Sequence, residues 1–487
     1  MISNQFDIAH VTITFTSPMI VGSGTGSDFS DAICIQDPNG LPTIPGTSIA
    51  GVLRHAMVKS WNHDASLSKT YRKQFEKELF GGAGITHSEG RRSLLTVSWA
   101  HLHDSNNRPV SHAVFTEDIT ATDPVLQTIK RGIFRDHVRI DPDTGTAAHT
   151  GKFDETLVPR GARFTFALML DTAKNQTGVK MSDLVAQLQR PDVFFGGKSR
   201  RGFGAFEVTQ VQYESFNLDD SESFSRFTQY SFDVSASFDF AQPNWEQEVN
   251  SDLRNEATYS VQLQAKDYLL PGGGAHIDAV FPYGFDFTLR DRLEHADMFP
   301  VYDIAIRWQD QGVNKQVGEV TPPRFYIPAT SIKGTLRHRV LFYARLLAGC
   351  SQTSANDTVQ EHGVYDYTQP DRFEDLDSAE LAINALFGSA ENDDRGKPGL
   401  VYIAEPVFSA DTSFRVMQHV ALDRFTQGPL QSALFGEVLL ELATQPFDLR
   451  IDVDWLSVQE RLEQSTVKLL QRSMELAIQD LVSQRLT

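Results

Sequence analysis

Cysteine is nearly absent from this sequence of 487 residues, which contains only Cys34 and Cys350. Two cysteines argue against a framework of several disulfides and against a cysteine zinc site. Long apolar runs are also missing, since no stretch approaches the roughly 20 residues that span a bilayer. Residues 1–15 lack the basic region and apolar core of a secretory signal. We therefore expect a cytoplasmic protein with no membrane partner.

Positive charge is scarce as well, because 44 Lys and Arg residues face 63 Asp and Glu residues, giving a net charge of −19. A surplus of acids argues against nucleic-acid binding. Most of it lies in two stretches, however: residues 212–256 carry ten acids and two bases, and residues 366–394 carry nine and one. Each stretch contributes −8, so the rest of the chain carries only −3. Since acidic stretches are usually solvated loops, RNA binding is disfavoured but not excluded.

An internal repeat is the clearest positive signal. Residues 44–55 (IPGTSIAGVLRH) and 327–338 (IPATSIKGTLRH) match at nine of twelve positions. In each copy a proline ends an extended approach, the following Thr-Ser pair predicts an N-cap hydroxyl, and an amphipathic helix follows. A chain of this length exceeds what one core usually supports. The repeat therefore predicts two duplicated domains.

Cations accompany both repeated helices. Arg54 and His55 lie off the apolar stripe of the first helix, and Lys333 and Arg337 lie off that of the second. A helix N-terminus with nearby cations suits a phosphate group, so these four residues are candidate RNA contacts. A capped helix packed beside a sheet, with no ligand, is the plainer interpretation of the same pattern.

A glycine-rich, basic segment closes the first half. Residues 194–208 (FFGGKSRRGFGAFEV) hold four glycines and three cations between Gly196 and Gly204. Glycines expose backbone N–H groups, and Lys198, Arg200 and Arg201 add charge, so a phosphate backbone is a candidate ligand. A plain basic hairpin is the alternative.

Other landmarks repeat in the same order. Leu-Phe-Gly at 79–81 is matched at 386–388, and HVRIDPDTGTAAHTGKF at 137–153 is matched by HVALDRFTQGPLQSALF at 419–435. The second half contains no counterpart to the glycine-rich segment. It continues instead into a predicted helix from Val458 to about Leu486, which we expect to pack on a neighbouring subunit or on the first half.

These landmarks divide the chain. We expect a first domain over residues 1–211, an acidic junction over 212–256 and a second domain over 257–487. The junction is low in structure signals, although its alternating YSFDVSASFDF piece is compatible with a strand.

Taken together, these motifs resemble a tandem fusion of two RAMP-superfamily domains, the backbone type of type III CRISPR effector complexes, and most closely the type III-D variants. The resemblance implies an α+β fold of two ferredoxin-like (RRM-like) domains. It also implies that segments 137–153 and 419–435 form thumb hairpins, which interrupt the pairing of guide RNA with target RNA. Arg424 in the second hairpin becomes a further RNA contact. The implied partners are guide RNA, target RNA and other CRISPR effector subunits in antiviral defence.

In catalytic relatives an Asp in the loop after the first strand supports metal-dependent cleavage of target RNA. The resemblance places that role on Asp31, with Asp28 as a near neighbour. In the second half Asp303 matches by local pattern, whereas Asp278 and Asp286 match by distance from the first strand. The expected cofactor is Mg²⁺ or another divalent cation, with Asp31 and Asp303 as metal ligands. The plainer interpretation of each Asp is a turn-forming role, which is the commoner one for Asp in a Gly/Ser loop.

Three functions within this family compete. The leading hypothesis is an RNA-guided endoribonuclease that cleaves target RNA by transesterification at sites interrupted by the hairpins. The alternative is a non-catalytic scaffold that binds guide RNA while other subunits cut. The third is a guide-processing endoribonuclease, which typically relies on histidine chemistry. Candidate general acids and bases are His10, His55, His137 and His149. A sugar- or peptide-binding protein is the hypothesis outside the family.

Overall fold

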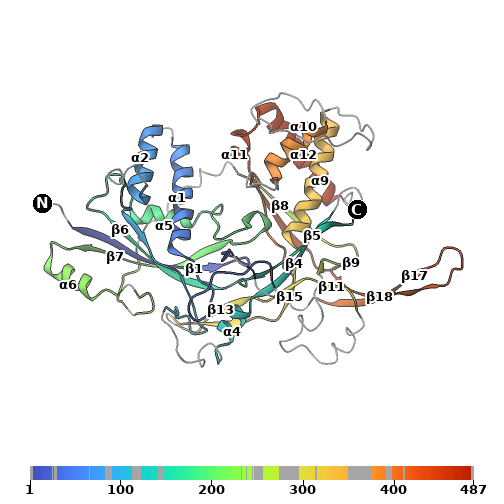
Figure 1. Cartoon of the computed structure of the whole chain (residues 1–487), viewed down its shortest axis with the longest axis horizontal. Coiled ribbons are helices and arrows are strands. Elements are labelled where there is room, and N and C mark those ends of the chain that lie inside the picture. The colour runs from blue at the N-terminus through green and yellow to red at the C-terminus, as the bar shows by residue number, and fades with distance from the viewer. Residues whose placement is uncertain are drawn as a thin grey trace. The chain divides into compact units, whose positions relative to one another are not determined.

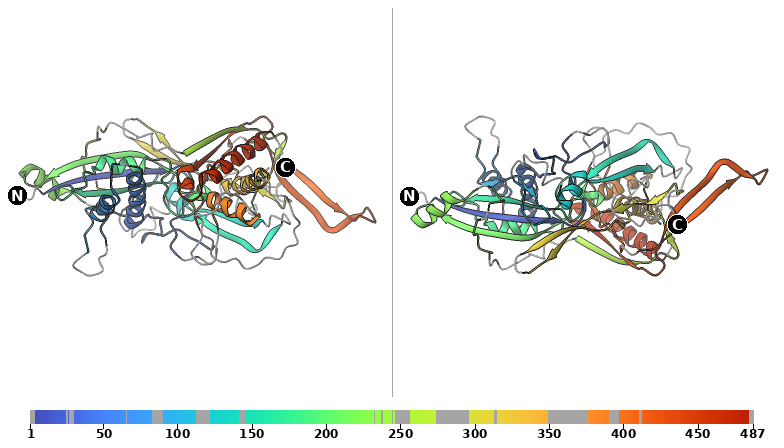
Figure 2. Two further views of the ribbon diagram at one scale, coloured as in Figure 1. Left: turned by 90° about the horizontal axis from the view of Figure 1, so that it is seen from above. Right: turned by 90° about the horizontal axis from the view of Figure 1, so that it is seen from below.

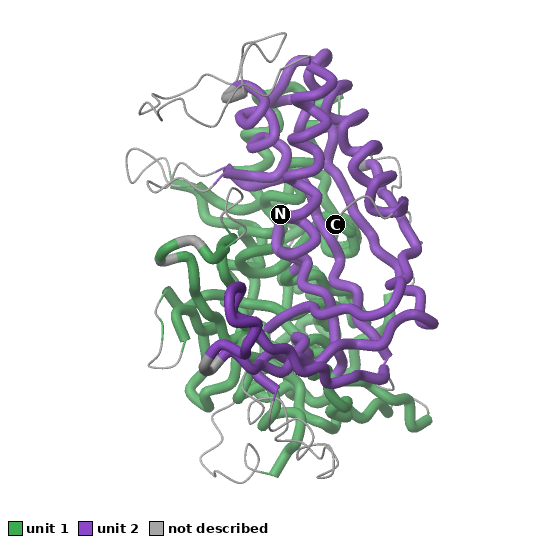
Figure 3. Tube along the Cα trace, turned by 90° about the vertical axis from the view of Figure 1, so that its right-hand side faces the viewer, with its two compact units in different colours: residues 1–199, 203–253, 303–323 green, residues 200–202, 254–302, 324–487 purple. Residues whose placement is uncertain are grey.

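The computed structural model divides the chain into two compact units, shown in different colours in Figure 3. Unit 1 comprises residues 1–199, 203–253 and 303–323, and unit 2 comprises residues 200–202, 254–302 and 324–487. The structure describes every residue except 1–3, 25, 27–29, 65, 83–89, 112–121, 141–145, 232, 237, 244, 246–255, 274–295, 313–314, 349–375, 390–396, 410–411 and 484–487.

The units do not follow the boundaries that the sequence predicts. Residues 200–202 of the glycine-rich segment belong to unit 2, and residues 303–323 of the second half belong to unit 1. Each half therefore contributes a short segment to the unit formed mainly by the other half. A sequence pattern reports local periodicity, and it contains no signal for such an exchange.

Unit 1 is built on an antiparallel sheet in which the first strand lies in the middle. The path runs β2 (Leu95–Val97), β6 (Arg163–Asp171), β1 (Gln5–Phe15) and β7 (Phe206–Asn217), and β3 (His101–Leu102) also pairs with β6. With α1 (Gly46–His63) after β1 and α5 (Met181–Leu188) before β7, this is the ferredoxin-like order. The predicted fold class is confirmed for this unit.

The main core of unit 1 lies between this sheet and its helices. Ala9, Val11 and Ile13 alternate along β1 and are fully buried, and Ile49 and Leu53 of α1 are buried in the same cluster. This is the face-to-face arrangement that alternation in a strand and the 3.6-residue period of a helix predict. Figure 1 shows α1, α5 and α2 (Lys69–Phe80) on one side of the sheet.

The acidic stretch expected as a junction belongs largely to unit 1. Residues 206–217 form β7, which pairs with β1 along its whole length, and α6 (Ser221–Gln229) follows. Tyr230 and Phe240 are buried with Ile8 on the sheet face opposite α1. The linker therefore begins later than residue 212, because the apolar residues between the acids fill a second small core.

The segment 303–323 completes unit 1 as an antiparallel hairpin of β13 (Ile306–Asp310) and β14 (Gln316–Val320). Trp308 Nε1 donates a hydrogen bond to the Gly161 carbonyl at 2.8 Å, and the Arg163 guanidinium lies 4.2 Å from the centre of the indole ring. β14 also contacts α4 (Pro124–Arg131). These contacts anchor the hairpin to β6 and to the adjoining turn.

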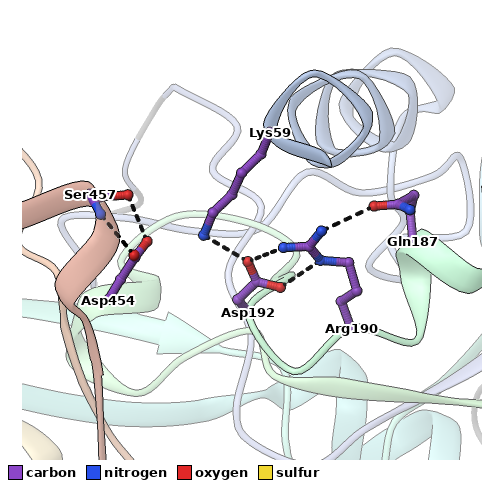
Figure 4. Close-up of polar contacts among 6 residues, drawn as sticks. All are labelled: Lys59, Gln187, Arg190, Asp192, Asp454 and Ser457. Atoms are coloured by element: carbon purple, nitrogen blue, oxygen red, sulfur yellow. Dashed lines mark hydrogen bonds and ion pairs between the residues drawn. The ribbon is translucent and has the colours of Figure 1, made fainter. Parts of the chain in front are cut away.

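Unit 2 has a smaller sheet of the same type, in the order β16 (Val401–Ile403), β19 (Phe447–Asp454) and β8 (Glu256–Leu263). Its core also contains α9 (Ala329–Leu347), α10 (Leu376–Phe387) and α12 (Gln464–Val482). The short helix α11 (Trp455–Gln459) lies between β19 and α12, and Asp454 is its N-cap residue. The Asp454 carboxylate accepts hydrogen bonds from the Ser457 backbone N–H at 3.0 Å and from the Ser457 hydroxyl at 2.8 Å (Figure 4).

Two predictions about helices are corrected by the structure. Both repeated helices begin directly after proline, at Pro45 and Pro328, and neither receives a side-chain cap. Each proline itself occupies the N-cap position with an extended backbone, so the Thr-Ser pair lies inside the first turn instead. The C-terminal segment forms α11 and α12, and α12 packs against α9 within unit 2.

Both predicted thumb hairpins are present. In unit 1, β4 (Ile133–Ile140) pairs with β5 (Ala147–Leu157). In unit 2, β17 (Phe414–Leu422) pairs with β18 (Pro429–Glu441), which also pairs with β9 (Tyr268–Leu269). Figure 2 shows the far end of β17–β18 extending beyond the rest of unit 2.

The two hairpins share a set of cross-strand contacts that confirms their correspondence in sequence. His137 stacks on Phe153 across the strands at 4.9 Å between ring centroids, and His419 stacks on Phe435 at 5.2 Å. A glutamate follows each Phe by two residues and lies close to the same imidazole. The Nε2–Oε distance is 3.8 Å for His137–Glu155 and 3.2 Å for His419–Glu437.

The remaining described strands are short. They are β10 (Gly272–Gly273), β11 (Phe299–Pro300), β12 (Tyr302–Asp303) and β15 (Arg324–Phe325), which form the two-stranded pairs β10–β11 and β12–β15. A single 3₁₀ turn spans Ser199–Arg201. Among the described helices, none combines the length and the hydropathy needed to cross a membrane.

Candidate functional site

Asp31 lies exposed alongside the first hairpin, next to the middle of β5. Its backbone N–H donates to Oδ1 of Asp154 at 2.9 Å, and the Asp154 N–H donates to Oδ2 of Asp31 at 3.0 Å. Asp154 belongs to β5, so this reciprocal pair fixes the Gly/Ser/Asp loop that carries Asp31 against the hairpin. The structure thus brings two carboxylates together where the sequence predicts one.

Asp154 is a residue that sequence reasoning missed. The only signal was its place in the KFDE end of the segment that resembles a thumb, and nothing in the sequence pairs it with Asp31. Oxygen donors from one or two carboxylates, completed by water, are what Mg²⁺ usually takes from a protein. Asp31 and Asp154 fit that donor set. In the described part of the chain, no group of three or more His, Cys, Asp or Glu side chains is arranged to hold a metal.

Asp303 has a different environment. It belongs to unit 1, its side chain is 4 % exposed, and Arg135 Nη2 lies 3.5 Å from its Oδ2. Arg160 Nε lies 4.0 Å from the same oxygen. A buried carboxylate between two guanidinium groups is typical of a structural ion-pair network. Asp28, Asp278 and Asp286 lie outside the described residues.

Lys198 points toward protein in this structure. Its ammonium forms an ion pair with Glu155 of β5, whose side chain is fully buried. Lys198 adopts a positive φ of 59°, a left-handed conformation that is uncommon for a residue with a side chain. The ion pair connects the glycine-rich segment to the first hairpin within unit 1.

Asp192 anchors the chain just before the glycine-rich segment, as Figure 4 shows. Its carboxylate accepts hydrogen bonds from Lys59 Nζ of α1 at 2.9 Å and from two nitrogens of Arg190 at 2.7 and 2.8 Å. Burial by itself raises the pKa of Asp192, but the bonds and charges of Arg190 and Lys59 outweigh it and lower the pKa well below its usual range. Arg190 in turn donates to Gln187 at 3.4 Å.

In unit 2 three predicted RNA contacts come together at the start of α9. Lys333 Nζ donates to the carbonyl oxygens of Arg200 at 3.1 Å and Val401 at 3.3 Å. Burial, followed by the charges of Arg200 and Arg201, lowers the pKa of Lys333 to about 7. The Arg200 guanidinium lies 4.3 Å from the ring centre of Tyr402. This cation cluster is defined by Lys333, Arg200 and Arg201.

A glycine permits this approach. Gly202 has a φ of +89°, and a Cβ added there would meet the Ala329 methyl at 3.0 Å and the Ile403 carbonyl oxygen at 3.1 Å. Glu405 also faces the helix start, where its Oε1 accepts from the Ala329 N–H at 3.5 Å. The first turn of α9 is thus lined by cations and by one carboxylate.

Of the predicted cations on the two repeated helices, Arg54 and Arg337 form contacts within the protein, and His55 is exposed. Arg54 pairs with Glu76 of α2 at 2.6 Å and is half exposed, and His55 is exposed beside it. Arg337 donates to Glu380 at 3.1 Å and to Asn384 at 3.0 Å, both on α10. Arg54 and Arg337 therefore tie each repeated helix to the next helix of its own unit.

The tip of the second hairpin presents Arg424 and Phe425 to solvent. Phe425 is 91 % exposed and Arg424 is exposed next to it. The Asp423 carboxylate accepts hydrogen bonds from the Thr426 backbone N–H at 2.7 Å, the Thr426 hydroxyl at 3.0 Å and the Phe425 backbone N–H at 3.0 Å. These bonds lower the pKa of Asp423 and shape the turn. An aromatic ring this exposed, beside a cation, is suited to stacking against a nucleobase.

Comparison with known proteins identifies the family. The model of the RAMP superfamily matches residues 12–207 and 301–477, which is well over half of the chain. The chain belongs to the RAMP superfamily. No curated protein sequence matches it. It is similar to a chain of a structure titled "Type III-B Cmr-beta Cryo-EM structure of the Apo state", at 16 % identity and a TM-score of 0.30, over 42 % of this chain and 96 % of that one.

The two regions matched by the RAMP model agree with the sequence repeat, but their boundaries differ from those of the two structural units. The second region begins at residue 301, so it includes residues 303–323 that pack in unit 1 and omits β8 of unit 2. Both regions contain one repeated helix and one of the two thumb hairpins. The duplication predicted from residues 44–55 and 327–338 is therefore confirmed at the level of the family.

The candidate histidines fall into two groups. His10 is buried in unit 1, where its Nε2 lies 2.8 Å from the Tyr230 hydroxyl and burial lowers its pKa to about 4. That imidazole is part of the core. His137 stacks on Phe153 across the first hairpin, whereas His149 is exposed on β5 and His55 is exposed on α1.

Proposed function

We propose that this RAMP protein is a backbone subunit of a type III CRISPR ribonucleoprotein that binds guide RNA and cleaves the paired target RNA beside Asp31. The observation that supports this most strongly is the reciprocal hydrogen bonding between Asp31 and Asp154. It holds an exposed carboxylate alongside a hairpin of the kind that, in the family resemblance, interrupts guide–target pairing. Two RAMP regions in one chain also suit an extended, repeating ligand.

The chemistry asks little of the protein, because RNA carries its own nucleophile. A 2′-hydroxyl attacks the adjacent phosphorus, the 5′-oxygen leaves, and the products are a 2′,3′-cyclic phosphate and a 5′-hydroxyl end. A divalent cation such as Mg²⁺, held by Asp31 and Asp154, would stabilise the charge that develops on the phosphate. The chain's own contribution is to hold the two carboxylates rigidly, since each accepts a backbone N–H of the other residue.

Guide RNA would contact the cation cluster of unit 2. Lys333, Arg200 and Arg201 gather at the N-terminus of α9, where the helix dipole also favours a phosphate. Contacts of this kind read the RNA backbone and leave sequence recognition to guide–target pairing.

The test uses the complex reconstituted with its other subunits, guide RNA and end-labelled target RNA. Asp31→Asn keeps a hydrogen-bond acceptor for the Asp154 N–H but removes the charge. We expect it to slow formation of one product by at least about a hundredfold, the effect typical of losing a group that acts at the reacting centre. Binding of guide and target should be unchanged, and a chelator should abolish the cut.

Asp303→Asn is the matched control. Because Asp303 is buried beside Arg135 and Arg160, we expect this change to lower thermal stability and to leave the product pattern intact. Loss of a second product at unchanged stability would instead give Asp303 a catalytic role. If Asp31→Asn and Asp154→Asn together leave every product in place, the nuclease assignment is wrong and the scaffold function takes its place.

A further inference from the structure

Among the strands that the structure describes, the sheet of unit 2 is three strands wide and that of unit 1 is four strands wide, because β2 and β3 both pair with β6. In chain order and antiparallel pairing, β8 corresponds to β1, β19 to β6 and β16 to β2. In unit 1 the other edge of the first strand is covered by β7, which pairs with β1 from Gln5 to Phe15. No described strand covers that edge of β8.

The direction of the backbone groups on β19 follows from its contacts with the segment of β16. The Asp454 N–H donates to the Leu400 carbonyl at 3.1 Å, and the Arg450 carbonyl accepts from the Ala404 N–H at 3.1 Å. In an antiparallel strand the N–H and C=O of one residue point the same way and alternate along the chain. Even-numbered residues of β19 therefore face β16, and odd-numbered residues face β8.

The register then fixes the orientation of β8. Tyr259 is paired with Ile451 and Val261 with Leu449, so these odd-numbered residues of β8 bond to β19. Thr258, Ser260 and Gln262 consequently direct both their N–H and C=O groups to the open edge. Their side chains are exposed as well. A row of unpaired backbone donors and acceptors is a template for another strand.

The burial of side chains along β8 also indicates that a neighbouring strand is missing. Its core-facing side chains are only half-buried although they pack against the core of unit 2: Ala257, Tyr259, Val261 and Leu263. On β1, where neighbours flank both edges, every residue from Asp7 to Phe15 is buried. A strand added beside β8 would cover these apolar side chains and pair the open backbone groups at once.

We propose that the open edge of β8 receives an antiparallel β-strand from a separate polypeptide, with apolar residues at alternate positions facing the core of unit 2. The charge of the neighbouring surface indicates which side chains alternate with these apolar residues on the added strand. On the outer face of β19, the neighbour of β8, the described charged residues are Asp448, Asp452 and Arg450, and Arg450 pairs with Asp452 at 2.9 Å. The net charge there is negative, so outward lysines or arginines on the added strand suit it. A second copy of this chain is disfavoured because each copy carries a net charge of −19.

The probe is a synthetic peptide with the sequence of β7, residues 206–217, which fills this position in unit 1. A second peptide carries Glu207→Lys and Glu214→Lys, two changes on the outward face. We expect the full-length, RNA-free protein to bind the lysine peptide more tightly than the native sequence in fluorescence anisotropy. A scrambled lysine peptide should not bind.

Ser260→Pro tests the edge itself. Proline is tolerated on an edge strand where its N–H would face solvent, so the ladder to β19 should survive. The lost N–H and the added ring should weaken binding of the lysine peptide about tenfold or more. Ser260→Ala keeps the N–H and should bind as the unaltered protein does. A lysine peptide with methylated backbone nitrogens on its pairing side should fail to bind unaltered protein, which gives a result even if Ser260→Pro misfolds.

Several results would overturn the proposal. One is absence of binding by the lysine peptide, and another is equal binding to Ser260→Pro and Ser260→Ala when both are folded. Protection of the Thr258, Ser260 and Gln262 amides from hydrogen exchange in the free protein would show that this chain already covers its own edge. A dimer that Ser260→Pro dissociates in sedimentation would assign the edge to a second copy.

Discussion

At the scale of single residues, Lys333 is the most informative cation in the chain. Burial and the neighbouring charges of Arg200 and Arg201 lower its pKa to about 7, from an ordinary value of 10.5. The folded protein thus binds fewer protons than the unfolded chain between about pH 7 and 10.5. Over that window the lysine makes unit 2 more stable as pH rises. An RNA phosphate would have the opposite preference, because it binds the protonated lysine.

We therefore predict that RNA affinity of the protein falls as pH rises from 6 to 8.5. The limiting slope is one decade in Kd per pH unit once pH exceeds the pKa, if one proton is taken up on binding. Filter binding at fixed ionic strength measures it. Lys333→Arg keeps its charge at every pH and should flatten the profile. An equally steep profile for that variant would show that Lys333 does not contact the RNA.

At the scale of secondary-structure elements, hairpin β13–β14 shows how a short segment is held in a unit formed mainly by the other half. Gly161 has a φ of +83°, and a Cβ there would lie 1.8 Å from the Ile306 carbonyl oxygen. The same turn accepts the indole N–H of Trp308. Only glycine satisfies both the backbone conformation and this close approach.

Gly161→Ala should accordingly lower the free energy of unfolding by more than about 2 kcal/mol, because strain and a backbone clash add. Backbone amides of residues 306–320 should exchange their hydrogens faster, because hairpin β13–β14 loses its contacts with the turn at Gly161. Gly178→Ala is the matched control, with a φ of +73° and no atom within 4 Å of the added Cβ, and should cost only about 1 kcal/mol. Similar losses for both variants would mean that the clash is relieved elsewhere.

At the scale of the whole molecule, the two units differ in how they are completed. Unit 1 closes its sheet with β7 and a small core around Tyr230, whereas unit 2 relies on its helices. Leu470, Met474 and Ala477 of α12 are fully buried there. Burial of each large apolar side chain contributes about 1.5–3 kcal/mol, so removing a helix of this kind exceeds the net stability of a typical domain.

Deleting residues 458–487 should therefore unfold unit 2 and leave the thermal transition of unit 1 in place. Differential scanning calorimetry and circular dichroism of the full and shortened chains would show it. Val482→Ala, at a position that is 54 % exposed on the same helix, should change little. A shortened chain that keeps both transitions and fails only to assemble would restore the expectation that this helix packs on a neighbouring subunit.

Several features of this protein can be predicted from its sequence alone. The twelve-residue repeat, the paired landmarks and the matching hairpins are local patterns, and each reports on periodicity or turn chemistry that neighbouring residues settle. They identified the duplication, and the resemblance to RAMP proteins that they carry implied the ferredoxin-like domains and both hairpins. Asp31 could be singled out because its loop follows the first strand in a chain that resembles RAMP proteins.

The tertiary structure decided the rest, because it depends on contacts between residues far apart in sequence. Asp154 meets Asp31 across 123 positions, Asp303 is enclosed by Arg135 and Arg160, and the three cations of the glycine-rich segment divide between two units. No periodicity records which carboxylate a folded chain will bury and which it will expose. Only the folded arrangement separates an ion pair within the core from a carboxylate available to a ligand.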